Sequence, residues 1–269
     1  MNNNYKHTLF ILDDSGSMTG LVDDAIGGFN QFLEEQKAYS EENGIKIVLD
    51  TILFGSPGSQ RYIHRNMDVR EIPKLTRHEY NAGSGATALL DAIGSGMMDL
   101  GNTLRKLGED ERPVEVNVQI FTDGMENSSH EFSHTKVTRM IEEQQSKYNW
   151  NIVFMASDLG ATDMARRMHI KNIAHAEKSG YGMRSVFDSS SKYMMMKMEE
   201  KEKMAYENLY NERLNYMKMK GGKDPSAGDS GADGSGKGSS GKGSSDKGSS
   251  GKGSSDASGT EGSQENSQS

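Results

Sequence analysis

The sequence predicts an α/β fold, in which a doubly wound, mainly parallel central sheet is flanked by helices and followed by a charged helix and a disordered tail. Short apolar runs alternate with amphipathic segments of helical period over roughly the first 180 residues, which is the pattern of a sheet covered on both faces. The composition then changes, because the chain from Gly221 to Ser269 contains almost no apolar side chain. Folding is therefore expected to end before this segment.

The first half of the folded part contains three expected strands and two expected helices. The strands are Thr8–Leu12, Ile45–Phe54 and Arg61–Asn66, and the helices are Leu21–Tyr39 and Thr87–Leu107. The first strand is a continuous apolar run, and the first helix repeats its apolar side chains at helical spacing. The segment Gly55-Ser56-Pro57-Gly58 is typical of a turn, so the strand after it is expected to run antiparallel to the strand before it.

The second half repeats the alternation of strands and helices. The strands are Val114–Phe121, Trp150–Met155 and Lys171–Ala174, and the helices are Ser133–Tyr148 and Thr162–Met168. Strands that alternate with helices indicate parallel pairing through crossover connections. In such sheets ligands bind beyond the carboxyl ends of the strands, near the point where the strand order reverses.

The C-terminal part divides into two further regions after a domain at residues 1–183. Residues 184–220 are charged and Met-rich, and they carry an apolar stripe at helical spacing, which consists of Tyr206, Leu209, Tyr210, Leu214 and Met217. This stripe either packs back on the domain or binds a partner, since Met-rich faces adapt to varied surfaces. Residues 221–269 repeat GKGSS or DKGSS, which predicts a disordered, hydrated spacer.

Composition excludes several classes of protein. The formal net charge is −8 with no clustered basic face, which argues against binding to nucleic acid or to acidic membranes. The chain contains no cysteine, which excludes disulfides, thiolate zinc sites and a cysteine nucleophile. The first apolar run is too short for a signal segment or a membrane span, so we expect a cytoplasmic protein.

Small oxygen-bearing side chains gather in three segments, each at an expected junction between a strand or Gly-rich loop and the next element. They are Asp13, Ser15 and Ser17 in the first segment, Thr87 in the second and Asp123 in the third. Two carboxylates and three hydroxyls suit a hard cation such as Mg²⁺, and Mn²⁺ would accept the same ligands. Each segment alone is common turn or cap chemistry, but the three together predict a metal site.

These residues resemble the metal-ion-dependent adhesion site of the von Willebrand factor type A (VWA) family, whose pattern is Asp-x-Ser-x-Ser, then Thr, then Asp. Stretches such as Gly85–Ile93 and Phe121–Asn127 look most like stand-alone bacterial and phage members. The resemblance implies a Rossmann-like fold in which the hydroxyls of Ser15 and Ser17 ligate the metal directly. It also implies that Thr87 joins them in the ligand-competent state. Asp13 and Asp123 would hold the ion directly or through water, and a carboxylate of the bound partner would complete the coordination.

Three acidic residues lie beside the motif residues in the sequence, and none of them is expected to be a metal ligand. Asp14 is expected to be a solvated loop charge. Asp91 is expected to be at most a hydrogen-bond acceptor that supports the ligands, and Glu126 is assigned no metal.

A rival pattern is His130-Glu131-Phe132-Ser133-His134, which matches the HExxH helix of zinc peptidases. In that class two His one helical turn apart bind zinc and the Glu is the general base. Ser128 and Ser129 indicate a helix entrance at this point, and no third-ligand motif follows.

The function expected from these features is a non-enzymatic, metal-dependent module that binds an acidic residue of a protein partner. No nucleophile, base and oxyanion group are assembled in the sequence, which disfavours an enzyme. An ATPase or assembly partner stays open. The alternative is a metal-dependent hydrolase, which would act either at His130, Glu131 and His134 or at the oxygen-ligand site.

Overall fold

A computed structural model describes residues 1–177 and 179–196. Six strands form one sheet in the order β3-β2-β1-β4-β5-β6. Their bounds are β1 (Asn2–Asp13), β2 (Lys46–Phe54), β3 (Arg61–Asp68), β4 (Pro113–Thr122), β5 (Asn151–Ala156) and β6 (Asn172–His175). Only β2 and β3 pair antiparallel, and the other neighbours are parallel. The expected doubly wound, mainly parallel α/β fold is confirmed.

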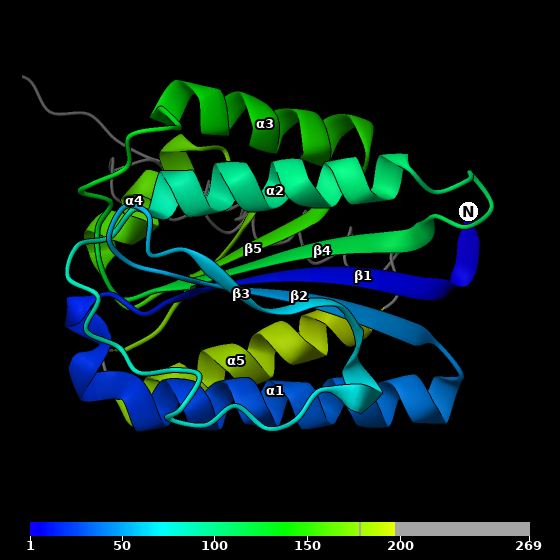
Figure 1. Cartoon of the computed structure of the whole chain (residues 1–269), viewed down its shortest axis with the longest axis horizontal. Coiled ribbons are helices and arrows are strands. Elements are labelled where there is room, and N and C mark those ends of the chain that lie inside the picture. Colours follow the sequence, from blue (N-terminus) through cyan, green and yellow to red (C-terminus); the bar gives the residue numbers. More distant parts are fainter. Residues whose placement is uncertain (178, 197–269) are drawn as a thin grey trace, which may run out of the picture. The chain divides into compact units, whose positions relative to one another are not determined.

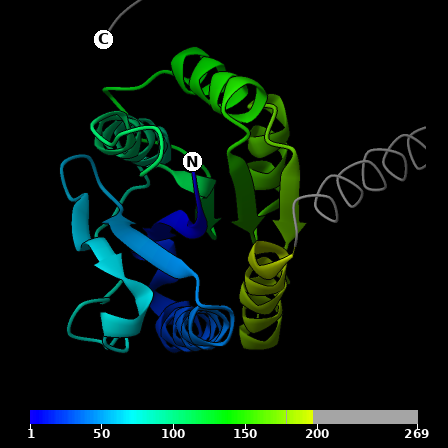
Figure 2. The same ribbon diagram turned by 90° about the vertical axis from the view of Figure 1, so that its right-hand side faces the viewer.

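Helices cover both faces of this sheet (Figures 1 and 2). Within the described residues they are α1 (Val22–Asn43), α2 (Leu89–Arg105), α3 (His134–Lys147), α4 (Leu159–Arg167) and α5 (Gly180–Met195), with short 3₁₀ turns η1 (Gly16–Leu21) and η2 (Val69–Glu71). Figure 1 shows α2 and α3 on one face and α1 and α5 on the other. None of the helices in this part of the chain is long and apolar enough to cross a lipid bilayer.

Alternation along β1 explains the two cores. Leu9 and Ile11 belong to the core shared with α2, α3 and α4. Phe10 and Leu12 point to the opposite core, which is shared with α1 and α5. Because successive side chains of a strand point to opposite faces, a continuous apolar run fills both cores. All four side chains have no exposed surface.

Strand β1 starts earlier than expected, at Asn2, because its polar residues find partners on neighbouring strands. His7 is fully buried, and its Nε2 lies 2.8 Å from the Asp50 carboxylate on β2. Lys6 forms a 3.1 Å ion pair with Glu115 on β4. Buried polar groups are tolerated when they are paired in this way. These partners are distant in sequence, which is why the apolar pattern alone missed the start of the strand.

Helix α5 crosses the boundary that was expected after Met183. The Phe187 ring is fully buried, stacking on Phe10 at 5.8 Å and on Phe121 at 5.0 Å between ring centroids. The domain core therefore continues through the helix that spans Gly180–Met195.

The remainder of the expected C-terminal organisation lies outside the described residues. This includes the apolar stripe from Tyr206 to Met217 within residues 184–220 and the repeats of residues 221–269.

The strand order places the chemistry predicted from the sequence at one edge of the sheet. The chain runs from β1 outward to β2 and β3, then returns through α2 to β4 on the other side of β1. The order therefore reverses between β1 and β4, which makes the carboxyl ends of these strands the topological switch point.

Candidate metal centre

Asp13 and Asp123 lie on either side of the switch point. Asp13 is the last residue of β1, and Asp123 follows the last residue of β4 directly. The Asp13 side chain is fully buried, and its carboxylate accepts hydrogen bonds from the Ser15 amide at 2.8 Å and from the Thr122 hydroxyl at 2.6 Å. The Tyr80 hydroxyl donates to the main-chain oxygen of Asp13 at 2.6 Å, which fixes the backbone.

The hydroxyls of Ser15 and Ser17 form a hydrogen-bonded chain to Asp123, and the Thr87 hydroxyl lies near this chain. The hydroxyls of Ser15 and Ser17 are 3.1 Å apart, and Ser17 donates to an Asp123 carboxylate oxygen at 2.5 Å. A Cβ placed on Gly124 would lie 3.3 Å from the Ser17 hydroxyl and 3.9 Å from the Thr87 hydroxyl, so both hydroxyls face the same small space. The structure therefore brings all five sequence-predicted ligands together.

Thr87 is held by a residue that the sequence did not single out. The expected helix begins only at Leu89, so Thr87 lies in the preceding loop. The Thr87 amide donates to the Asn127 side-chain oxygen at 2.9 Å, and the Asn127 amide donates back to the Thr87 carbonyl at 3.1 Å. This two-point contact fixes the Thr87 loop to the segment that carries Asp123. Asn127 lies in the motif segment, but its contact with Thr87 is visible only in three dimensions.

The electrostatics fit a hard cation. Burial raises the pKa of Asp13 from 3.8 to about 6, and the nearby Asp123 charge adds to the increase, while hydrogen bonds from Thr122 and Ser15 oppose it. Within the described residues no Lys or Arg pairs with the Asp13 carboxylate, whose hydrogen-bond donors are neutral. Two close, buried carboxylates that are surrounded by hydroxyls form an all-oxygen donor set of the kind that Mg²⁺ and Mn²⁺ accept.

The expectation for Asp14 was wrong. It is not a solvated charge, since it is 1% exposed and forms a 2.7 Å ion pair with Arg61 on β3. The Ser84 hydroxyl lies 3.0 Å from its other carboxylate oxygen. The Asp14 amide also donates to the Phe54 carbonyl at 2.7 Å, and the Gly83 amide donates to the Asp14 carbonyl at 3.0 Å. These contacts enclose Asp14 between two loops, which its position after a strand did not reveal.

The other two acidic neighbours brace the loop that follows the Asp123 segment. The Asp91 carboxylate accepts the main-chain amides of residues 130, 131 and 132 at 2.8–2.9 Å. The Glu126 carboxylate accepts the amides of Leu90, Ser128 and Ser129 at 2.7–2.9 Å. Both carboxylates thus tie the loop to the first turn of α2. Asp91 is a hydrogen-bond acceptor, but the groups that it accepts from are loop amides.

The HExxH pattern does not form its helix. Helix α3 begins at His134, and the Ser133 side chain caps it by accepting from the Lys136 amide, so His130 and Glu131 precede the helix. The expected helix entrance is confirmed, although Ser133 caps it instead of Ser128 or Ser129. Across residues 1–177 and 179–196, no group of three or more His, Asp or Glu side chains is arranged to hold a metal. The candidate oxygen site is not such a group, because it contains only two carboxylates and its other three members are hydroxyls.

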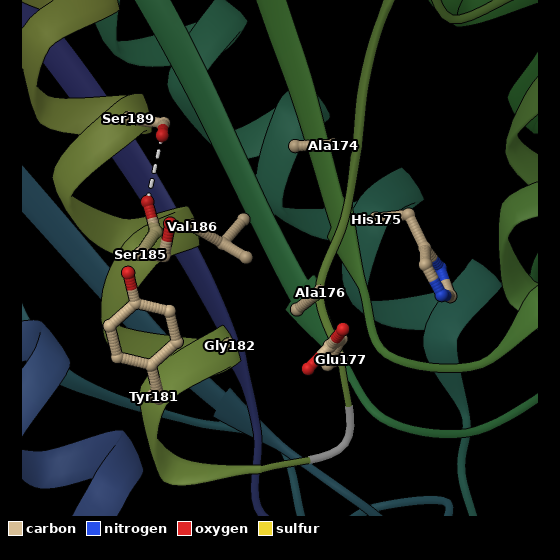
Figure 3. Close-up of a pocket in the computed structure, with 9 residues that line it drawn as sticks. All are labelled: Ala174, His175, Ala176, Glu177, Tyr181, Gly182, Ser185, Val186 and Ser189. Atoms are coloured by element: carbon tan, nitrogen blue, oxygen red, sulfur yellow. Dashed lines mark hydrogen bonds between the residues drawn. The ribbon is translucent and has the colours of Figure 1, made fainter.

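A hollow of about 280 Å³ lies between β6 and α5, and none of the five candidate ligands lines it. Figure 3 shows Glu177, Tyr181 and Ser185 around it, while His175 points to the other side of the strand. It is a separate surface feature.

Comparison with known proteins supports the fold. Neither a protein-family model nor a curated protein matches the sequence. The pilus adhesin SpaC from Lactobacillus rhamnosus GG aligns with a TM-score of 0.53 and 11% identity, over 72% of this chain and 30% of the adhesin. The SpRpn10 VWA domain aligns with a TM-score of 0.49 and 11% identity, over 68% of this chain and 94% of that domain. Proximal thread matrix protein 1 from the mussel byssus aligns with a TM-score of 0.49 and 14% identity, over 72% of this chain and 47% of that protein.

The alignment with SpaC agrees with the doubly wound α/β class. At 11% identity the likeness shows the fold alone, and the matched region is 30% of the adhesin's length.

Proposed function

We propose that this chain is a metal-dependent protein-binding module. It holds Mg²⁺ or Mn²⁺ with Asp13, Ser15, Ser17, Thr87 and Asp123, and it binds a partner protein through an Asp or Glu carboxylate. The observation that carries the proposal is the convergence of these five oxygen-bearing side chains at the carboxyl ends of β1 and β4. Ligands bind at this place in doubly wound sheets.

The charge of the donor set supports an acidic partner. The two carboxylates neutralise a divalent cation, and the hydroxyls add no further charge. Because no third anionic side chain belongs to the donor set, an open coordination position on the ion would accept a carboxylate from a partner, in a partly dehydrated setting where the interaction is stronger than in water. Magnesium prefers octahedral coordination and usually retains waters, one of which the partner carboxylate would replace.

A binding role also agrees with the printed description of one structural neighbour. SpaC is called a pilus adhesin, which is a binding protein. We propose the same class of activity for this chain, and we leave the partner defined by its carboxylate.

Calorimetric titration of Mg²⁺ and Mn²⁺ into the metal-stripped protein tests the metal site. We expect one binding site in the wild type, and loss of binding in Asp13→Asn and in Thr87→Val. The matched control is Asp110→Asn, which changes an exposed carboxylate in the loop before β4. Equal binding by the wild type and Asp13→Asn would contradict the proposal.

Binding of short peptides tests the second half of the proposal. A labelled Gly/Ser peptide that contains one Asp should bind in Mg²⁺ but not in EDTA, and the same peptide with Asn should bind in neither. Binding that is indifferent to chelation, or to the exchange of Asp for Asn, would refute recognition of a carboxylate by the metal.

A further inference from the structure

Two large apolar side chains are exposed at the edge of the sheet that carries the candidate metal site. Met125 follows Asp123 by two residues and is 54% exposed. Leu159 is the first residue of α4 and is 68% exposed. Helix α4 follows β5, which is the direct neighbour of β4 in the sheet. Met125 therefore belongs to the loop that carries Asp123, and Leu159 begins the helix that follows the neighbouring strand.

The Met125 side chain packs against the start of α4, where Leu159 is the first residue. A Cβ placed on Gly160 would lie 2.6 Å from the Met125 sulfur and 3.0 Å from its Cγ. The Met125 thioether therefore rests on the backbone of Gly160, which is the residue after Leu159. Any larger residue at position 160 would displace the Met125 thioether. We call these two residues the Met125–Leu159 surface.

We propose that the Met125–Leu159 surface binds a bulky apolar side chain that flanks the acidic residue of the protein partner. This inference rests on the proposed function, because the metal fixes the partner's carboxylate and so places its neighbouring residues. Met125 is two residues from Asp123, a chain distance of at most about 7 Å. In an extended segment of the partner, a residue one or two positions from the bound Asp or Glu lies at a similar distance from it along the chain.

The chemistry of the surface identifies the kind of occupant. The cation attracts a carboxylate, whereas the Met125–Leu159 surface offers no charge and only weak hydrogen-bonding capacity. Methionine side chains adapt their shape, so Leu, Ile, Met or Phe in the partner would fit equally well.

Fluorescence anisotropy with two labelled peptides tests this specificity in Mg²⁺. One is a Gly/Ser peptide with a single Asp, and the other is the same peptide with Leu on both sides of the Asp. We expect the Leu-flanked peptide to bind the wild type about tenfold more tightly, which corresponds to about 1.4 kcal/mol. The double variant Met125→Ser/Leu159→Ser should reduce this preference to about twofold or less.

The control variant is Met98→Ser, which removes another exposed methionine, 49% exposed on α2. It should keep the full preference. Mg²⁺ titration and thermal unfolding of both variants should match the wild type, because all three side chains lie at the surface. Equal affinity of the two peptides, or a preference that survives in the double variant, would overturn the inference.

The outcome separates this inference from the proposed function. If Mg²⁺-dependent binding of the Gly/Ser peptide with Asp is seen but Leu adds nothing, only the apolar contact is wrong. If neither peptide responds to Mg²⁺, the proposed function fails and the inference falls with it. Mg²⁺-dependent self-association that the double variant abolishes, measured by sedimentation, would assign the surface to a second copy and overturn the inference as well.

Discussion

Replacing Asp13 by asparagine should stabilise the metal-free protein while it abolishes metal binding. Burial holds the pKa of the Asp13 carboxyl at about 6, compared with 3.8 in the unfolded chain. A carboxyl whose pKa is raised by folding prefers to be protonated in the folded state. The ionised form therefore destabilises the metal-free fold above pH 6, and this penalty disappears as the pH falls from 6 to below 3.8.

The magnitude follows from the size of the shift. Each pKa unit corresponds to 1.36 kcal/mol, so the penalty at pH 7.5 is about 3 kcal/mol. At pH 4.5 the folded carboxyl is protonated and the unfolded one is still mostly ionised, which leaves about 1 kcal/mol. Asparagine has the same shape and no charge. Its oxygen can accept from the Ser15 amide, and its amide can donate to the Thr122 hydroxyl. The proton of that hydroxyl, which donates to Asp13 in the wild type, can then turn to the Gly124 carbonyl, which is 3.1 Å away.

Urea unfolding in EDTA at the two pH values measures the effect. The free energy of unfolding of Asp13→Asn should exceed that of the wild type by up to about 3 kcal/mol at pH 7.5 and by about 1 kcal/mol at pH 4.5. The exposed Asp110→Asn variant should match the wild type at both pH values. In saturating Mg²⁺ the wild type should gain stability and the Asp13 variant should not. A less stable Asp13→Asn at pH 7.5, or a difference independent of pH, would refute the reasoning.

Three further predictions concern residues outside the ligand set. Asn127→Ala removes one of the two hydrogen bonds that hold Thr87, and it should weaken Mg²⁺ affinity about tenfold in calorimetry. The control variant Asp110→Asn should keep the wild-type affinity. Arg61→Gln leaves the buried Asp14 carboxylate without its cation and should lower the free energy of unfolding by about 2 kcal/mol, as measured in urea. Phe187→Ala should lower it by about 3–5 kcal/mol, whereas Ala at the exposed Tyr181 of the same helix should change it little. An unchanged unfolding midpoint in the Phe187 variant would place α5 outside the core.

Local patterns predicted the elements and the motif residues, whereas long-range contacts decided the rest. The apolar period located β4 and α3 because those signals lie within one segment of chain. It could not show that Asp14 meets Arg61, since that ion pair joins residues 47 positions apart. The boundary expected after Met183 divides helix α5, because no local pattern shows that Phe187 stacks on Phe10 and Phe121.

The site shows the same division between local and long-range information. The residue types at Asp13, Ser15 and Ser17 pointed to a cation because their spacing lies within one loop. The support that Asn127 gives to Thr87 depends on two loops that only the sheet brings together. The exposure of Leu159 also depends on where α4 starts, which the sequence placed three residues later.

The separation of the candidate ligands along the chain sets a time at which the site can first exist. Ser17 and Asp123 are in contact although 106 residues separate them. A ribosome that adds about 5–20 residues per second needs roughly 5–20 s to make that stretch. During this interval the serine loop has no carboxylate opposite it, and β1 has no β4 beside it. The nascent chain would therefore acquire affinity for the ion only after β4 has emerged and paired, so ion uptake would report that the centre of the sheet is complete.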